Sequence, residues 1–362
     1  EDGGTGVLYL WMSTSLPTLL CSAVLILAAK LSGALAGRIG LPVVLGELMA
    51  GVVLGPTFLN FWSLSWFHAT TMNPVSAEAV FKVLAEIGVV LLMYHAGLET
   101  DVAMMRSAVA PAFWAATGGV ILPMVGGVLL SRGIGLSWQE SVFVGTILTA
   151  TSVTITAQTL MNLKKIRSKA GSTILGAAVI DDVLGLIVLS VVIALGPQLA
   201  SGSATSWRGL GITLGRMVIC LILIFSLGPR LTRWIFKYAA RLHGAHSEVS
   251  GALIVAFLLA FLSEWLGGMA AITGAYVAGL FVAAMPAHQN QKVTHDLHPM
   301  ISAFFGPLFF VSIGLEINAW QLGGHFGFFA ALLGVAVLGK IIGCSVGAFF
   351  NGFRTRESLI VG

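Results

Sequence analysis

Residues 174–190 read ILGAAVIDDVLGLIVLS, an apolar run of helix length with two adjacent aspartates, Asp181 and Asp182, at its centre. An aspartate at the centre of a membrane helix costs roughly 2.5–3.5 kcal/mol on insertion scales, so two in succession cost on the order of 5–7 kcal/mol unless something compensates them. Acids at this depth usually face a partner or a water-filled cavity and mark an ion or proton pathway. The stretch therefore predicts a membrane helix that carries an ion site.

The composition places the whole chain in the lipid bilayer. Of the 362 residues, 57% are hydrophobic and 9% are charged, whereas about a quarter of a soluble domain is charged. The net charge is +4, without a basic block interleaved with aromatics, so we expect no nucleic-acid partner. The three cysteines stand in separate apolar runs, and no catalytic, metal-site or nucleotide-binding motif is present. We therefore expect neither an enzyme nor a bound cofactor.

Long apolar segments with short loops between them fill the sequence, and about 20 such residues cross a bilayer. We predict an all-α polytopic protein in which 1–362 forms a single membrane-embedded unit, with eleven complete transmembrane helices and the start of a twelfth near Glu357. The eleven segments lie near 14–36, 43–60, 80–98, 111–131, 139–161, 170–195, 208–236, 248–265, 268–285, 296–315 and 325–349.

The lysines and arginines orient these segments. When the loops are numbered alternately, one set carries thirteen basic residues and the other carries two, Arg132 and Arg208. Loops rich in lysine and arginine stay in the cytoplasm, so the N-terminus is expected outside. The thirteen are Arg38, Arg106, Lys164, Lys165, Arg167, Lys169, Arg230, Arg233, Lys237, Arg241, Lys292, Arg354 and Arg356.

Two apolar segments differ from ordinary spans. LTATSVTITAQTL, at 148–160, places five hydroxyl side chains within eight residues. Such residues compete for backbone hydrogen bonds, which favours a discontinuous helix whose carbonyls and hydroxyls line an ion site. A continuous helix with a tight seam of small residues is the alternative. SEWLGGMAAITGAYVAGLF, at 263–281, is rich in glycine, and there we expect close helix packing.

Lys340 is the expected partner of one aspartate. Adjacent residues of a helix point about 100° apart, so Asp181 and Asp182 cannot both face one neighbour. One can face an aqueous cavity while the other meets a cation on another helix, and Lys340 is the deeply placed lysine of the C-terminal half. A bridge that only fixes packing is the alternative, but it leaves the second aspartate without a purpose.

The chemistry available to such a site is coupled exchange. A carboxylate can hold either a proton or a small hard cation, but not both, and nearby hydroxyls and freed carbonyls supply the oxygen ligands that Na⁺ requires. Competition of H⁺ and Na⁺ for one carboxylate is sufficient for exchange, provided that the loaded site is exposed alternately to the two sides. Two titrating carboxylates would allow two protons per cation, which makes transport electrogenic.

Besides the Asp-Asp run and the hydroxyl-rich segment, four further stretches form a pattern in order along the chain: PVVLGELMAGVVLGP (42–56), LAEIGVVLLMYHAGLET (84–100), GPLFFVSIGLEI (306–317) and LGKIIG (338–343). Together these stretches resemble the bacterial NapA-type Na⁺/H⁺ antiporters, which belong to the monovalent cation:proton antiporter-2 group. Related Kef-like potassium proteins typically have Gln-Asp, not Asp-Asp, at the paired acids.

The resemblance implies an NhaA-like fold of thirteen helices with inverted repeats and discontinuous helices. It also implies a homodimer in which a core domain (80–195 and 296–362) slides like an elevator against a dimerisation domain (14–60 and 208–285). Asp182 would be the main ion-binding carboxylate, and Asp181 would pair with Lys340 in one state and release it in another. Thr151 and Ser152 would lie where two discontinuous helices cross and would belong to the ion-binding site with the two aspartates.

We therefore expect an electrogenic secondary transporter of a bacterial inner membrane that exchanges Na⁺ or Li⁺ for H⁺. Its partners would be the transported ions, the lipid bilayer and a second copy of the chain. A K⁺/H⁺ antiporter of the Kef-like type is one alternative. In the family, a second broken helix and a final helix follow the segment near Arg354, whereas this chain stops at Gly362. We thus expect the C-terminal part to be missing, and a non-transporting or truncated membrane protein is the second alternative.

Overall fold

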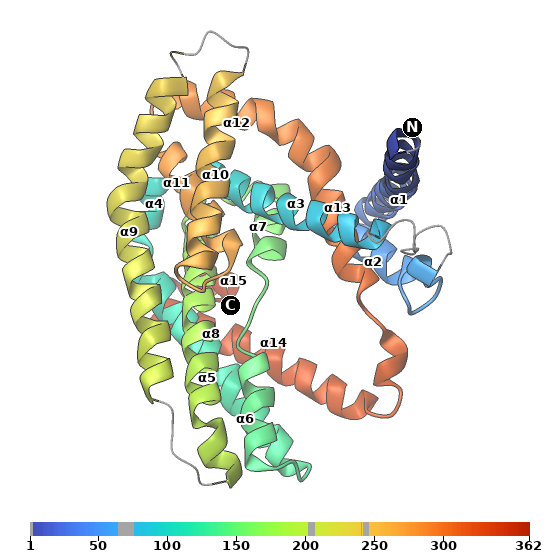
Figure 1. Cartoon of the computed structure of the whole chain (residues 1–362). Coiled ribbons are helices and arrows are strands. Elements are labelled where there is room, and N and C mark those ends of the chain that lie inside the picture. Colours follow the sequence, from blue (N-terminus) through green and yellow to red (C-terminus); the bar gives the residue numbers. More distant parts are fainter. Residues whose placement is uncertain (1–2, 64–75, 202–206, 240, 242–245) are drawn as a thin grey trace. The chain divides into compact units, whose positions relative to one another are not determined.

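The structure of the chain is a computed structural model that describes residues 3–63, 76–201, 207–239, 241 and 246–362 (Figure 1). Every regular element in this part of the chain is a helix, which confirms the all-α class. Within the described residues, eight helices are long and apolar enough to cross a membrane, and there are two shorter apolar helices, α2 (Val43–Leu54) and α11 (Ala271–Ala283). The predicted total of eleven complete spans is not confirmed in the described residues.

The long apolar helices are α1 (Gly3–Arg38), α3 (Ala77–Glu99), α5 (Val109–Gly133), α8 (Lys169–Ser201), α9 (Trp207–Ala239), α10 (Ser247–Trp265) and α14 (Phe326–Phe349). The eighth span, Gln289–Gln321, is composite: it contains most of α12 (Ala287–Met300), a π-helical turn (Ile301–Phe305) and α13 (Gly306–Leu315), and it ends in the following 3₁₀ turn. The other elements are α4 (Val102–Ser107), α6 (Trp138–Ile147), α7 (Val153–Asn162), α15 (Thr355–Val361) and 3₁₀ turns at Phe61–Ser63 and Ala319–Leu322.

One compact unit comprises Glu1–Leu92 and His295–Gly324. Its core joins α1, α2 and α13, with Leu25 of α1 and Leu308 of α13 fully buried. Helices α2 and α13 meet through glycines, since a Cβ at Gly51 would overlap the backbone of Gly314. Lipid tails are as apolar as the side chains, so close contacts between small residues are a main source of helix association in membranes.

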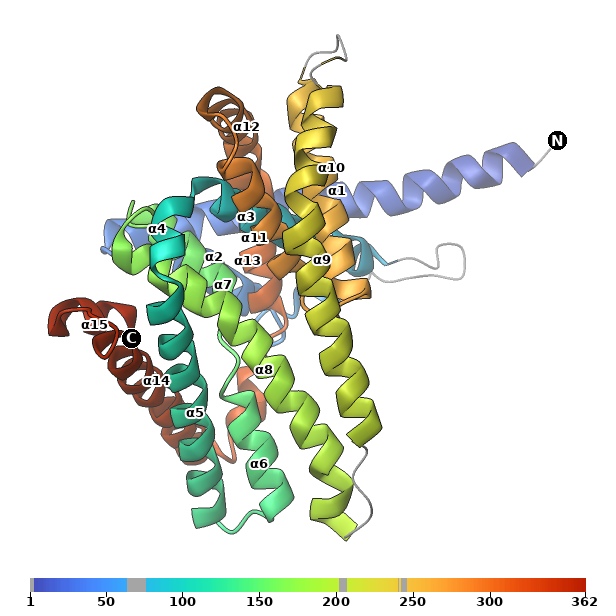
Figure 2. The ribbon, with the colours of Figure 1, turned by 90° about the vertical axis from the view of Figure 1, so that its left-hand side faces the viewer.

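The other compact unit comprises Met93–Thr294 and His325–Gly362. In it α5 packs against α14, α8 and α6, and α10 packs against α9 and α11; Figure 2 shows α14 alongside α5. Gly118 of α5 and Gly343 of α14 lie backbone to backbone, because a Cβ on either would overlap the other. Gly274 of α11 fits against Leu259 of α10 in the same way, so the glycine-rich segment is closely packed.

The hydroxyl-rich segment is interrupted. Helix α6 ends at Ile147, and α7 begins at Val153 with Ser152 as its N-cap, whose Oγ accepts a hydrogen bond from Ile155 N at 3.4 Å. The residues between the two helices run in an extended path that is visible in Figure 1. Their side chains compete with the helix for backbone groups, and the interruption leaves backbone carbonyls available to other partners.

Candidate ion-binding site

Asp181 of α8 is joined to α14 by Lys340. The Asp181 side chain is 6% exposed, and Lys340 Nζ donates a hydrogen bond to its Oδ2 at 2.9 Å. The same ammonium donates to Thr149 O at 3.0 Å, a carbonyl of the interrupted segment between α6 and α7. One lysine thus holds both the buried carboxylate and the break in the helix, and all three groups belong to the same compact unit.

Asp182 has a different partner. It is half-buried, and Thr273 Oγ1 donates to its Oδ2 at 3.1 Å. Thr273 is buried in the first turn of α11, which begins at Ala271. The roughly 100° between successive helical side chains therefore separates the two carboxylates: Asp181 is engaged by the ammonium of α14, and Asp182 by a neutral hydroxyl of α11.

Both carboxylates line a cavity of about 420 Å³. Its rim includes Ile147 and Leu189, whose side chains are exposed, so the cavity reaches the surface of this unit. Thr149 Oγ1 donates to Thr146 O at 2.8 Å and keeps lone pairs that can accept from water or coordinate a cation. The complete lining is Phe143, Thr146, Ile147, Thr149, Ala150, Asp181, Asp182, Gly185, Leu186, Leu189 and Ala270.

The two hydroxyl residues that the resemblance pointed to have separate positions. The Thr151 side chain interacts with Asp181, whose Oδ1 is buried and has no hydrogen-bond partner of good geometry in the described part of the chain. Ser152 instead caps α7 and does not line the cavity. The structure thus gathers Asp181, Asp182, Lys340 and Thr151, and leaves Ser152 to begin the next helix.

Thr273 is the site residue that the sequence analysis missed. The segment around it was interpreted as close packing alone, and the packing of Gly274 agrees with that interpretation. Its signal is weak, because a single threonine in an apolar helix commonly bonds its own backbone. Only the position of α11 beside α8 gives this hydroxyl to Asp182.

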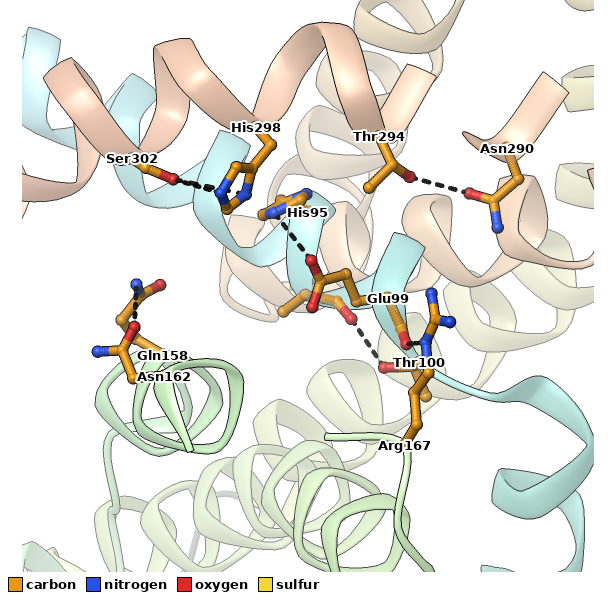
Figure 3. Close-up of polar contacts among 11 residues, drawn as sticks. His95, Glu99, Thr100, Gln158, Asn162, Arg167, Asn290, Thr294, His298 and Ser302 are labelled. Atoms are coloured by element: carbon orange, nitrogen blue, oxygen red, sulfur yellow. Dashed lines mark hydrogen bonds and ion pairs between the residues drawn. The ribbon is translucent and has the colours of Figure 1, made fainter. Parts of the chain in front are cut away.

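A second cluster of polar side chains lies at the C-terminal end of α3 (Figure 3). The His95 side chain is 1% exposed, and its Nε2 lies 3.4 Å from Glu99 Oε1, one turn further along the helix. Arg167 Nε donates to Glu99 O at 3.0 Å, and Thr100 Oγ1 donates to Ala96 O at 2.7 Å. A cation at a helix C-terminus is favourable because the last carbonyls carry partial negative charge, so Arg167 stabilises this end of α3.

Comparison with known proteins identifies the family. A sequence profile described as "Sodium/hydrogen exchanger, transmembrane" matches residues 24–362. The chain belongs to this family. The chain is similar to the probable Na⁺/H⁺ antiporter GerT of Bacillus cereus, to which it is 34% identical over 340 residues, or 94% of this chain and 84% of that protein. A Na⁺/H⁺ antiporter of Enterococcus hirae is 30% identical over 348 residues, or 95% and 84% of the two chains.

Two other relatives widen the comparison. The Na⁺/H⁺-K⁺ antiporter GerN of Bacillus cereus is 35% identical over 340 residues, which cover 94% of this chain and 82% of that protein. The structure of the sodium proton antiporter MjNhaP1 from Methanocaldococcus jannaschii superimposes with a TM-score of 0.63 over 96% of this chain and 81% of the other, at 16% identity. This last likeness shows that the chain shares the fold of MjNhaP1.

Proposed function

We propose that the chain exchanges Na⁺ for H⁺ across a membrane, with Asp182 as the main carboxylate that the two ions share. The observation that carries the proposal is the pair of carboxylates on the wall of one cavity, of which only Asp181 is paired with the ammonium of Lys340. Asp182 has the neutral Thr273 hydroxyl as its partner, so its negative charge remains for a cation or a proton.

The ligands around Asp182 suit a small hard cation. Unwound backbone and hydroxyls beside a carboxylate are the groups with which discontinuous-helix transporters coordinate Na⁺, and Thr149 and Thr273 supply hydroxyl oxygens here. A proton on Asp182 removes the charge that the cation requires, so each ion displaces the other. The chain belongs to the sodium/hydrogen exchanger family, and this membership supports Na⁺ and H⁺ as the exchanged ions.

We further propose that the exchange is electrogenic and proceeds by an elevator movement within a homodimer. Asp181 is a second carboxylate that a proton can neutralise once Lys340 leaves it, which would allow two protons per cation. In this proposal helices of 80–195 and 296–362 form the moving core, and those of 14–60 and 208–285 form the dimerisation part. The test is transport at a valinomycin-clamped voltage, to which an electroneutral exchanger would be indifferent.

K⁺/H⁺ exchange is the second candidate, and the descriptions of two relatives favour it. GerN is described as a Na⁺/H⁺-K⁺ antiporter, and the potassium-efflux protein KefC of Klebsiella pneumoniae is 30% identical over 314 residues. The adjacent pair Asp181–Asp182 argues for Na⁺, because the Kef-like proteins that the sequence resembles have Gln-Asp there. Parallel assays with Na⁺, Li⁺ and K⁺ distinguish the candidates.

Proton movement in everted vesicles or proteoliposomes tests the proposal. With a ΔpH-sensitive dye, the native chain should dequench on addition of Na⁺, and Asp182→Asn should abolish the response because the shared charge is gone. Glu264→Gln is the matched control, since Glu264 is an exposed acid at the end of α10 that does not line the cavity. Normal exchange by Asp182→Asn would show that the site is misassigned.

A further inference from the structure

A second cavity, of about 590 Å³, lies on another face of α8. It is enclosed by α4, α5, α8, α9 and α11, which all belong to one compact unit, and both the α8–α9 and α9–α11 pairs are in contact. Gly176, Val179 and Val183 form its wall on α8. Neither aspartate lines this cavity, so it is separate from the ion-binding site.

The wall of this cavity is apolar over a length that matches a lipid chain. Its residues on α9 run from Leu221 to Pro229, which corresponds to about 12 Å at 1.5 Å per residue. The hydrocarbon of one leaflet is roughly 15 Å thick, half of the bilayer core. Phe225 and Phe281 make an edge-to-face contact in the wall, and Tyr276 turns its hydroxyl to Thr100 and Met105.

One arginine lines the cavity, and a second contacts a residue of its wall. Arg106, at the end of α4, lines it, is exposed, and forms none of the side-chain hydrogen bonds or ion pairs found in the described part of the chain. Pro229, also in the lining, accepts a hydrogen bond from Arg233 Nε at 3.2 Å, which places a second guanidinium nearby. Arg106 lies in α4 and Arg233 in α9, and the distribution of basic residues along the sequence predicts that both lie on the cytoplasmic side.

We propose that this cavity binds an anionic phospholipid of the cytoplasmic leaflet, with an acyl chain among α8, α9 and α11 and the phosphate at Arg106. The helices that line the cavity are membrane-embedded, so the acyl chains of the surrounding lipids are the apolar ligands available to it. Basic pockets between transmembrane helices on the cytoplasmic side are suited to anionic headgroups. A zwitterionic lipid would fill the same space without the charge pairing.

Native mass spectrometry of the purified full chain in detergent tests the proposal. Phosphatidylglycerol and phosphatidylcholine with identical acyl chains are titrated separately, and the fraction of protein with bound lipid is measured. We expect phosphatidylglycerol to bind about fivefold more tightly, the factor that corresponds to about 1 kcal/mol per basic residue at a membrane surface. Millimolar inorganic phosphate should not displace it, because the acyl chain supplies much of the affinity.

Substitutions locate the binding. Arg106→Gln should reduce phosphatidylglycerol binding to the level of phosphatidylcholine, and Arg106→Lys should restore most of it. Arg132→Gln, at the far end of α5 and outside the cavity, is the control and should bind like the native chain. Val179→Trp should fill the cavity and weaken the binding of both lipids. Equal binding of the two lipids by the native chain, an unaffected Arg106→Gln, or displacement by phosphate would overturn the proposal.

Discussion

Lys340→Gln removes the cation from a buried ion pair while keeping a group that can still donate to Thr149 O. Asp181 is 6% exposed and Lys340 is 19% exposed, with 2.9 Å between Nζ and Oδ2. Breaking a buried pair by removing one partner costs about 3–5 kcal/mol, because the remaining charge is uncompensated. At roughly 2–4 °C per kcal/mol, we expect the unfolding midpoint to fall on the order of 10 °C.

The assay is thermal unfolding of the purified protein in detergent, followed by intrinsic fluorescence. Lys292→Gln is the matched control: Lys292 Nζ lies 3.0 Å from Glu248 Oε2, but the lysine is 54% exposed, and exposed pairs contribute at most about 1 kcal/mol. Its midpoint should fall by no more than about 4 °C. The two lysines therefore separate the effect of burial from that of ion pairing itself.

The double variant Lys340→Gln/Asp181→Asn decides whether the lost stability comes from an uncompensated carboxylate. With both charges removed, more than half of the lost stability should return, because residues in contact are coupled and their effects do not add. The fall in the unfolding midpoint caused by Lys340→Gln should also be smaller at pH 5 than at pH 8, since a proton on Asp181 removes the buried charge. Additive effects and a loss that is independent of pH would refute the reasoning.

Further predictions concern the cation site and the helix packing. Thr273→Val removes the hydrogen bond to Asp182, and hydrogen bonds to charged groups contribute about 1.5–3 kcal/mol. The half-saturating Na⁺ concentration in dye-dequenching assays should therefore rise at least roughly tenfold. An unchanged concentration would contradict the assigned contact. Competition of the two ions for Asp182 requires that this concentration rise as pH falls, and a flat profile measured by the same assay between pH 6 and 9 would contradict a shared carboxylate. Gly118→Ala should lower the unfolding midpoint because its Cβ would overlap Gly343, whereas Gly334→Ala, with nothing within 4 Å of its Cβ, should leave the midpoint unchanged.

Some tertiary features follow from patterns that the chain carries locally. The hydroxyl cluster at 148–160 predicted a break, and α6 and α7 are separate helices. The count of complete spans was less predictable, because hydropathy records only how apolar a window is. A window of that kind does not distinguish one continuous helix from two short ones, nor a full span from a short apolar helix such as α2.

By itself, the sequence determined that this chain lies in a membrane, that Asp181 and Asp182 are too costly to be there without partners, and that a deep lysine such as Lys340 could pair with one of them. The family resemblance implied that Asp181 is the aspartate that pairs with Lys340, and the structure has this pair. Only the tertiary structure decided that Asp182 meets Thr273. The physical reason is that helical periodicity sets the angle between successive side chains, whereas the neighbour that each side chain reaches depends on which distant helices pack beside α8.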